Sequence, residues 1–258
     1  MYYPIQIPYL LNKSFSEHIH YSEEFAENCG GFVVCFWSMV PLSDQKLIVN
    51  NIIAADACID LVVNFDEKDI AFAGMRKTAF DFPLSLPFQS FGARMMPGAF
   101  YQLTGIPATN AMDTLLPIEE VYPDFDRVLL FSLPFDKSKE YFKVFLAEKT
   151  KGKTPDIFTD LFHKLSVKSP STAKALYEML NFSPRQCQRL FAKHYGIAPK
   201  MALSIVRFQK CLEMLTSSQA TPVDILSAVH YYDQPHLIND FKHNMGITPQ
   251  ELIHIYRS

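Results

Sequence analysis

The sequence predicts an α+β protein in which a β-rich N-terminal part precedes an all-helical C-terminal part. Three observations lead to this expectation: short apolar segments fill the first half, a helical pattern occurs twice in the last third, and the net charge changes sign between them. We therefore expect a β-rich domain over residues 1–125, a helical linker over 126–167 and a helical domain over 168–258.

Composition excludes several classes of protein. The 258 residues are 48% hydrophobic and 20% charged, which suits a buried core and not a disordered chain. No run of eighteen apolar residues is present, so we expect a cytoplasmic protein without a membrane segment. The five cysteines are odd in number and form no C-x-x-C pair, which favours reduced thiols in the core over disulfides or a zinc site.

The N-terminal domain is expected to be a small barrel or sandwich. Four of its segments are short, rich in β-branched or aromatic residues and bounded by turn residues, a pattern typical of strands. They are residues 32–37, 47–49, 58–65 and 70–73.

The expected linker holds three segments with apolar residues at helical spacing: 126–133, 138–149 and 155–167. Residues 149–154 (KTKGKT) are the expected hinge. The apolar faces of these helices favour packing inside the protein over a dimer interface, and dimerisation stays open as the alternative.

The charge asymmetry concerns the two ends of the chain. Residues 1–167 hold 14 basic and 21 acidic side chains, a net charge of −7, whereas residues 168–258 hold 10 and 6, a net charge of +4. This indicates an acidic body joined to a domain that meets a polyanion.

The last third of the chain repeats itself after fifty residues. Each copy predicts a short apolar helix, a tight turn, a capped second helix that ends at Gly, and a Pro that opens the next helix. The matched pairs are Ser183 with Asp233, Phe191 with Phe241, Gly196 with Gly246, Ile197 with Ile247, and Pro199 with Pro249.

In the first copy a helix is expected to begin at Ser171 or Thr172, residues 181–183 to turn, and Pro184 to open the second helix. The outward face of that second helix carries no acidic residue. Its polar side chains are Arg185, Gln188, Arg189 and Lys193.

In the second copy the first helix is expected to begin at Thr221 and Pro222, and the second at Gln234 or Pro235. The outward polar residues of this second helix are His236, Asn239, Lys242 and His243. Residues 200–215 are expected to form one connecting helix, so that the two helical pairs could reach successive major grooves about 34 Å apart along DNA.

The stretch from Ser171 to Tyr256 resembles the DNA-binding domain of the AraC/XylS family of bacterial transcription regulators. The resemblance lies in Ser183-x-Arg185-x-x-Gln188-Arg189-Leu190-Phe191, in Tyr195-Gly196-Ile197-x-Pro199, in Arg207, and in Phe241-Lys242-x-x-x-Gly246-Ile247-Thr248-Pro249-x-x-Leu252.

This resemblance implies a sequence-specific regulator that binds promoter DNA, forms homodimers and has RNA polymerase as a further partner. It places the second helix of each unit in the major groove and six residues near bases: Arg185, Gln188, Arg189, Gln234, His236 and Asn239. Arg can pair bidentately with guanine and Gln with adenine, whereas Lys193 and Lys242 are better placed for phosphates.

The blocks at residues 56–60, 91–100 and 105–107 are similar to an N-terminal domain of unassigned role that is fused to AraC-type DNA-binding domains. By analogy with cupin-like effector barrels, this implies a regulatory domain that receives a small-molecule or protein signal. Asp60 and Arg94 lie inside apolar stretches, where an ionised group needs a partner, so they are candidates for a ligand pocket or for a structural ion pair.

Two other functions compete with this one. The spacing His18-x-His20-x-x-x-Glu24 is that of a cupin metal motif if the histidines alternate on a strand, which would suit a metal-dependent enzyme tethered to DNA. No nucleotide-binding or nucleophile motif supports this, and we expect neither an enzyme nor a cofactor. The third function is a protein-interaction regulator with a solid core, which predicts no pocket at Asp60 or Arg94.

Overall fold

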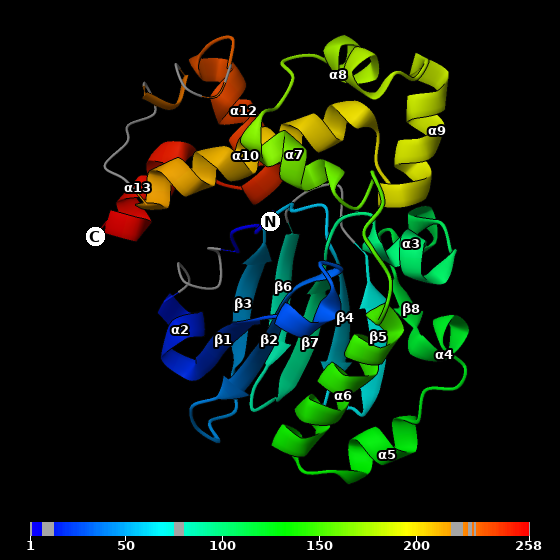
Figure 1. Ribbon diagram of the computed structural model, residues 1–258. Helices are drawn as coiled ribbons and strands as arrows, with labels where there is room; N and C mark the ends of the chain where they lie inside the picture. Colours follow the sequence, from blue (N-terminus) through cyan, green and yellow to red (C-terminus); the bar gives the residue numbers. More distant parts are fainter. Residues whose placement is uncertain are drawn as a thin grey trace.

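The computed structural model describes residues 2–6, 13–74, 80–217, 224–226, 229 and 231–257. A β-rich body forms one end of the protein and a group of helices forms the other (Figure 1). The expected α+β class is confirmed.

The described part of the body holds a six-stranded antiparallel sheet and a two-stranded antiparallel sheet. In spatial order, the larger sheet consists of β1 (Ile19–Phe25), β2 (Val33–Pro41), β7 (Ser90–Met95), β4 (Ile59–Asn64), β5 (Asp69–Ala73) and β8 (Leu115–Pro117). The smaller sheet pairs β3 (Ile48–Ile53) with β6 (Phe80–Ser85). All four predicted strand segments are confirmed, as β2, β3, β4 and β5.

Strands β1, β6, β7 and β8 were not predicted from the sequence. β1 has the polar sequence IHYSEEF, and β7 contains Gly92 and Arg94 although all six of its residues are buried. A strand buried on both faces lacks the alternation that identifies strands in a sequence.

The large sheet has two different faces. On β4, Leu61 and Val63 are buried on one face, while Asp60 and Asn64 lie on the other. Helix α6 (Phe135–Thr150) covers the apolar face, and the ring of its Phe142 packs against Phe91 at 5.4 Å between centroids. The other face looks toward the β3–β6 sheet.

Short helices surround this body. They are α2 (Lys13–His18), η1 (Glu27–Cys29), α3 (Ala99–Thr104), η2 (Ala108–Ala111), α4 (Ile118–Val121), α5 (Arg127–Ser132) and α7 (Leu161–Val167).

Two of the three predicted linker helices are confirmed as α5 and α6, and the third is shorter than expected. Helix α7 begins only at Leu161, because the Asp156 carboxylate accepts hydrogen bonds from the backbone N–H groups of Phe158 and Thr159 and holds these residues in a turn.

The C-terminal helices confirm the fifty-residue repeat. Ser183 and Asp233 cap their helices by accepting a hydrogen bond from the backbone N–H of the third helical residue. Phe191 and Phe241 are fully buried. The helices are α8 (Ala173–Leu180), α9 (Pro184–Tyr195), α10 (Pro199–Ser217), α12 (Gln234–Met245) and α13 (Pro249–Arg257). The expected helix start at Thr221 and Pro222 lies outside the described residues.

All five cysteines are buried and free, as the sequence predicts. A continuous apolar core extends from the sheet through α6 and α7 to α9 and the first half of α10. Within the described ranges, no helix is both long and apolar enough to span a membrane.

Candidate functional site

The second helix of the first unit, α9, presents a bare polar face. Arg185, Gln188, Arg189 and Lys193 are all exposed, as predicted. Cys187 is buried on the opposite side of the helix. Neither Arg185 nor Arg189 forms an ion pair with any described residue. The two guanidinium groups are therefore available to an external anion or base edge.

The second helix of the second unit, α12, carries less charge on its outward face. Gln234, Asn239 and Lys242 are exposed. His236 is only half-exposed, because its ring packs edge-on against Tyr231 at 5.2 Å between centroids.

A buried acid on α12, which the sequence did not single out, joins this unit to α10. Asp240 is 9% exposed and accepts hydrogen bonds from Tyr231 Oη at 2.8 Å and from Ser204, while Arg207 Nε lies 3.4 Å from its carboxylate. Arg207, which forms part of the AraC-type motif, therefore orients α12 within the protein.

The long helix α10 connects the two units and runs between α9 and α12 (Figure 1). Nineteen residues in an α-helix span about 28 Å. This length is close to one turn of DNA, about 34 Å, so the connector suits two units that approach one face of a duplex.

The N-terminal body contacts the end of α9 by packing. His194 lies between the ring of Tyr101, at 4.6 Å, and that of Phe158, at 4.0 Å. The Tyr195 hydroxyl donates to the Phe158 carbonyl at 2.6 Å, and Lys193 Nζ lies 4.6 Å above the Tyr101 ring. Lys193, predicted to contact phosphate, is thus engaged by the body in this conformation.

The body contacts the second unit mainly by hydrogen bonds, and Ala54 and Ile5 also pack against the apolar core of that unit. The backbone N–H of Ala55 donates to the carbonyl of Asn244 on α12 at 3.2 Å. Gln209 on α10 donates through Nε2 to the Ala55 carbonyl at 3.0 Å and accepts from the Ile5 N–H at 2.7 Å. Residues 194 and 244 are equivalent in the fifty-residue repeat, so the body contacts both units at the same position.

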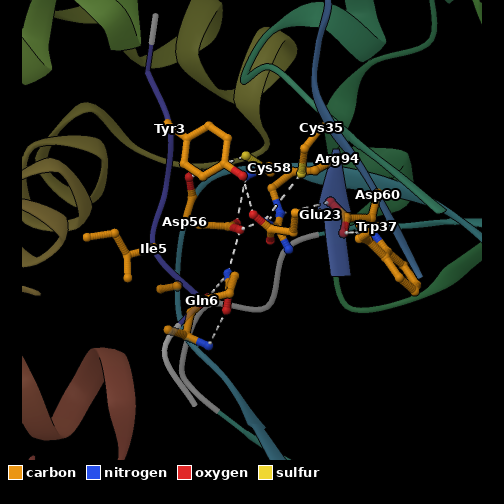
Figure 2. Close-up of polar contacts among 12 residues, drawn as sticks. Tyr3, Ile5, Gln6, Glu23, Cys35, Trp37, Asp56, Cys58, Asp60 and Arg94 are labelled. Carbon is orange, nitrogen blue, oxygen red and sulfur yellow. Dashed lines mark hydrogen bonds and ion pairs between the residues drawn. The ribbon is translucent and has the colours of Figure 1, made fainter. Parts of the chain in front are cut away.

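Beside these contacts lies a buried ionic cluster around Arg94, whose side chain is 2% exposed (Figure 2). Its Nη1 lies 2.9 Å from Glu23, and its Nε lies 3.6 Å from Asp56 and 3.8 Å from Asp60. Asp60 and Arg94 are direct cross-strand partners on β4 and β7, so the two residues predicted as a pair do meet.

Glu23 and Asp56 were missed as members of this cluster. Glu23 lies on the unpredicted strand β1 and Asp56 in a loop, so only the fold brings them to Arg94. Gln6 Nε2 donates to Asp56 at 2.6 Å, and Trp37 Nε1 donates to Asp60 at 2.9 Å (Figure 2).

The three carboxyl groups titrate differently. Burial raises the pKa of Asp60 to about 7, although the Arg94 guanidinium acts in the opposite direction. Burial also raises the pKa of Asp56 above its ordinary value. At Glu23 burial is outweighed by Arg94 and by the hydroxyl donors of Tyr21 and Tyr3, so the pKa lies below its ordinary value.

Asp60 and Arg94 line a cavity of about 490 Å³ between the two sheets. Its apolar wall includes Trp37, Met39 and Leu84. Gly92 on β7 makes room for this wall, because a Cβ there would lie 2.5 Å from the Trp37 ring. The interaction module with a solid core, which predicts no such pocket, does not account for this feature.

The metal motif does not form as the spacing suggested. His18 is the last residue of α2 and His20 lies in β1, so the two histidines do not alternate along one strand. Within the part of the chain that the structure describes, no group of three or more His, Cys, Asp or Glu side chains could hold a metal ion.

Two family models match separate parts of the chain. Residues 176–254 match a helix-turn-helix domain, and residues 28–117 match a domain of unknown function (DUF6597). The C-terminal part is therefore a helix-turn-helix domain of the AraC type, and this domain supports a DNA-binding transcription regulator. No curated protein matches the chain.

Several solved structures are similar to the chain. The C-terminal domain of AraT, a response regulator from Geobacillus stearothermophilus, is 27% identical, with 36% of this chain and 79% of that chain covered and a TM-score of 0.34. ToxT from Vibrio cholerae is 12% identical, with coverages of 93% and 100% and a TM-score of 0.41. ToxT bound to (E)-4-(8-methylnaphthalen-1-yl)but-3-enoic acid is 13% identical, with coverages of 93% and 99% and a TM-score of 0.40.

Proposed function

We propose that the protein is a sequence-specific regulator whose helices α9 and α12 enter successive major grooves of a promoter. The observation that carries this proposal is the duplicated unit itself: both copies share cap, core phenylalanine and closing glycine, and each leaves one polar helix face exposed. A face of this kind on the second helix of a helix-turn-helix unit is what reads DNA.

Individual roles follow from side-chain chemistry. Arg185, Gln188 and Arg189 are proposed to read bases from α9, and Gln234, His236 and Asn239 from α12. Lys193 and Lys242, near the helix C-termini, are proposed to contact phosphates, which fixes register without reading sequence.

Selection tests this function directly. The purified full chain would be incubated with a genomic fragment library at about 150 mM salt, where non-specific contacts are weakened, and the retained fragments sequenced. We expect one common site with two half-elements. Retention of fragments without a shared sequence would contradict sequence-specific binding.

The selected site then separates base reading from phosphate contact. Arg189→Ala is expected to weaken binding to that site by about 1–3 kcal/mol, whereas Lys242→Ala weakens binding to all DNA alike and lowers the salt slope by about one. Equal losses on specific and random DNA for Arg189→Ala would refute its base-reading role.

We further propose that a small-molecule effector in the cavity controls DNA binding. Three consecutive residues support this: Ala54 and Asp56 bond to Gln6, Asp56 also meets Arg94 at the cavity, and Ala55 between them bonds to the second unit. A ligand that moves Asp56 would therefore move the residue that contacts Asn244 and Gln209.

We also propose that the protein forms a homodimer through the helical region 126–167. RNA polymerase is a further proposed partner. Val128 on α5 and Val144 on α6 are 82% and 62% exposed, although Phe142 and Leu146 of α6 are buried in the body. Sedimentation of the full chain at tens of micromolar tests the dimer, and a monomer would contradict it.

A further inference from the structure

The cavity places more negative than positive charge beside a ligand. Of its described lining residues, Asp56, Asp60, Glu67 and Asp69 are acidic, and Arg94 alone is basic. Glu67 and Asp69 are exposed, and Asp69 lies 3.7 Å from Arg127. The inner pair of Asp56 and Asp60 therefore decides which charge the cavity accepts.

Arg94 cannot serve as an open anion site. Its single positive charge lies within 4 Å of Glu23, Asp56 and Asp60, three carboxylates that also surround it from different strands and loops. An anionic ligand would have to approach these carboxylates as well. When all three acids are ionised, the cluster has a net negative charge, which a bound cation would balance.

Asp60 is the most exposed of the cluster members that line the cavity. Its side chain keeps 21% of its surface exposed, against 10% for Asp56 and 2% for Arg94. The Trp37 indole donates to one carboxylate oxygen of Asp60 from the same wall. A cation beside Asp60 would therefore also meet an aromatic side chain.

A second observation points to a ligand at this place. Asn51 on β3 lines the cavity and is 1% exposed, yet neither atom of its carboxamide has a hydrogen-bond partner among the described residues. A buried amide is normally paired, because an unpaired one has a free-energy cost of about 1–3 kcal/mol. Asn51 thus presents an unpaired NH2 group that can donate and an unpaired carbonyl oxygen that can accept, from the wall opposite Asp60.

The remainder of the wall sets the shape of the ligand. Trp37, Met39, Val62, Ile53, Leu84 and Phe88 line the cavity. Its volume of about 490 Å³ falls within the usual range for small-molecule sites, roughly 300–1,000 Å³. An apolar body of moderate size would fill it.

We propose that the effector is an organic cation, an amine with an apolar body, whose ammonium group lies beside Asp60 and whose polar substituent bonds to Asn51. This inference rests on the proposed function, because it names the ligand class of the regulatory cavity. It predicts selectivity by charge, which a general apolar pocket would not show.

The inference also predicts a pH dependence. With the pKa of Asp60 near 7, the carboxyl is mostly protonated at pH 6 and ionised at pH 8, so cation affinity should rise about tenfold between them. Arg94, Asp56, Glu23, Cys35 and Cys58 face this group from the neighbouring strands and loop, and alkylammonium groups stay charged throughout this range.

Binding of matched probes to the full chain tests the proposal. The probes are 4-phenylbutylamine, 4-phenylbutanoate and 4-phenylbutan-1-ol, which share the apolar body and differ in charge, and the readouts are calorimetry and the shift in Tm. We expect binding of the amine, more strongly at pH 8 than at pH 6, and weaker or no binding of the other two.

Variants locate the charge. Asp60→Asn should remove the preference for the amine and its pH dependence, and Asn51→Leu should weaken binding without removing either. Asp44→Asn, an exposed acid outside the cavity, is the matched control and should change nothing. Circular dichroism and Tm confirm that each variant is folded.

The outcomes separate this inference from the proposed function. Preferential binding of the butanoate, equal binding of all three probes, or an unchanged amine preference in Asp60→Asn would overturn the cationic effector. Selection of a DNA site by the full chain is measured independently of the probes, so DNA recognition can stand while this inference fails.

Discussion

The two helix-turn-helix units share an architecture but meet the N-terminal body through different chemistry. The first unit is packed: His194 stacks on Phe158, and a Cβ at Gly196 would lie 2.5 Å from Met112. The second unit is joined mainly by hydrogen bonds, through the Asn244 carbonyl and Gln209, and of the described body residues only Ala54 and Ile5 pack against its apolar core. The outward faces of their second helices also differ, because α9 exposes two arginines and α12 exposes none.

This difference assigns different tasks to the two units. Apolar packing buries surface and holds the first unit firmly, whereas a few hydrogen bonds contribute less and can exchange with water. The hydrogen bonds lie next to Asp56 and the cavity. We therefore expect the first unit to provide most of the base reading and the second to receive the signal.

The largest effect is expected from the packed contact. Phe158→Ala should lower the free energy of unfolding by about 3 kcal/mol, because the ring of Phe158 is 8% exposed and contacts His194 and Tyr195. Chemical denaturation measures this change. Ile157→Ala, at a side chain that is 51% exposed, is the control, and an equal loss there would show that no special contact exists.

Base reading should be unequal between the units. Arg185→Ala on α9 is expected to cost about 1–3 kcal/mol at the selected DNA site, whereas Asn239→Ala on α12 costs less than about 1 kcal/mol. Fluorescence anisotropy at fixed salt gives both values. A larger loss for Asn239→Ala would reverse the assignment of tasks.

The hydrogen-bonded contact should carry the signal. Gln209→Ala removes bonds to Ala55 and Ile5 and should cost about 1–2 kcal/mol of stability. It should also weaken the effect of an effector on DNA affinity while leaving effector binding intact, because, among the hydrogen bonds of the described residues, only Ala55–Asn244 then links the loop to the second unit. Gln250→Ala, exposed on α13, should retain the coupling.

A smaller change is expected where the body engages Lys193. Tyr101→Leu removes the ring beneath the ammonium, an interaction worth about 0.5–1 kcal/mol, and frees Lys193 for phosphate. DNA affinity should then rise about two- to fivefold. Unchanged affinity in Tyr101→Leu would mean that Lys193 already reaches DNA with Tyr101 in place.

The smallest effect concerns pH. Burial lowers the pKa of His194 below its ordinary 6.5, an effect that Asp156 opposes and Lys193 reinforces. The folded state then binds fewer protons than the unfolded state, so this group adds stability above about pH 6.5 that is lost as the pH falls. His194→Phe should flatten the slope of the unfolding free energy between about pH 7 and pH 5. If His194→Phe and the original protein had the same slope, another titrating group would be responsible for this pH dependence.

The repeat was predictable from the sequence because its signals are local. N-caps, closing glycines and helical spacing act within a few residues, so Ser183 and Gly196 and their counterparts identify the units without any tertiary information. The same shift also pairs His194 with Asn244, a signal that could have revealed the two contacts with the body.

The cavity was only half predictable. Asp60 and Arg94 stood out as charges in apolar stretches, but their partners depend on strand register. β1 brings Glu23 to Arg94 through β2, and the loop after β3 brings Asp56. Pairings between distant segments leave no local pattern, and neither does the unpaired amide of Asn51.

Joint reading of DNA by the two units is tested by measuring how tightly the full chain binds its selected site and the same site with five base pairs inserted between the half-elements. Two units on one rigid helix should lose at least about tenfold in affinity, since half a turn places one half-element on the opposite side of the duplex. Equal affinity for both sites would show that the two units do not read DNA together.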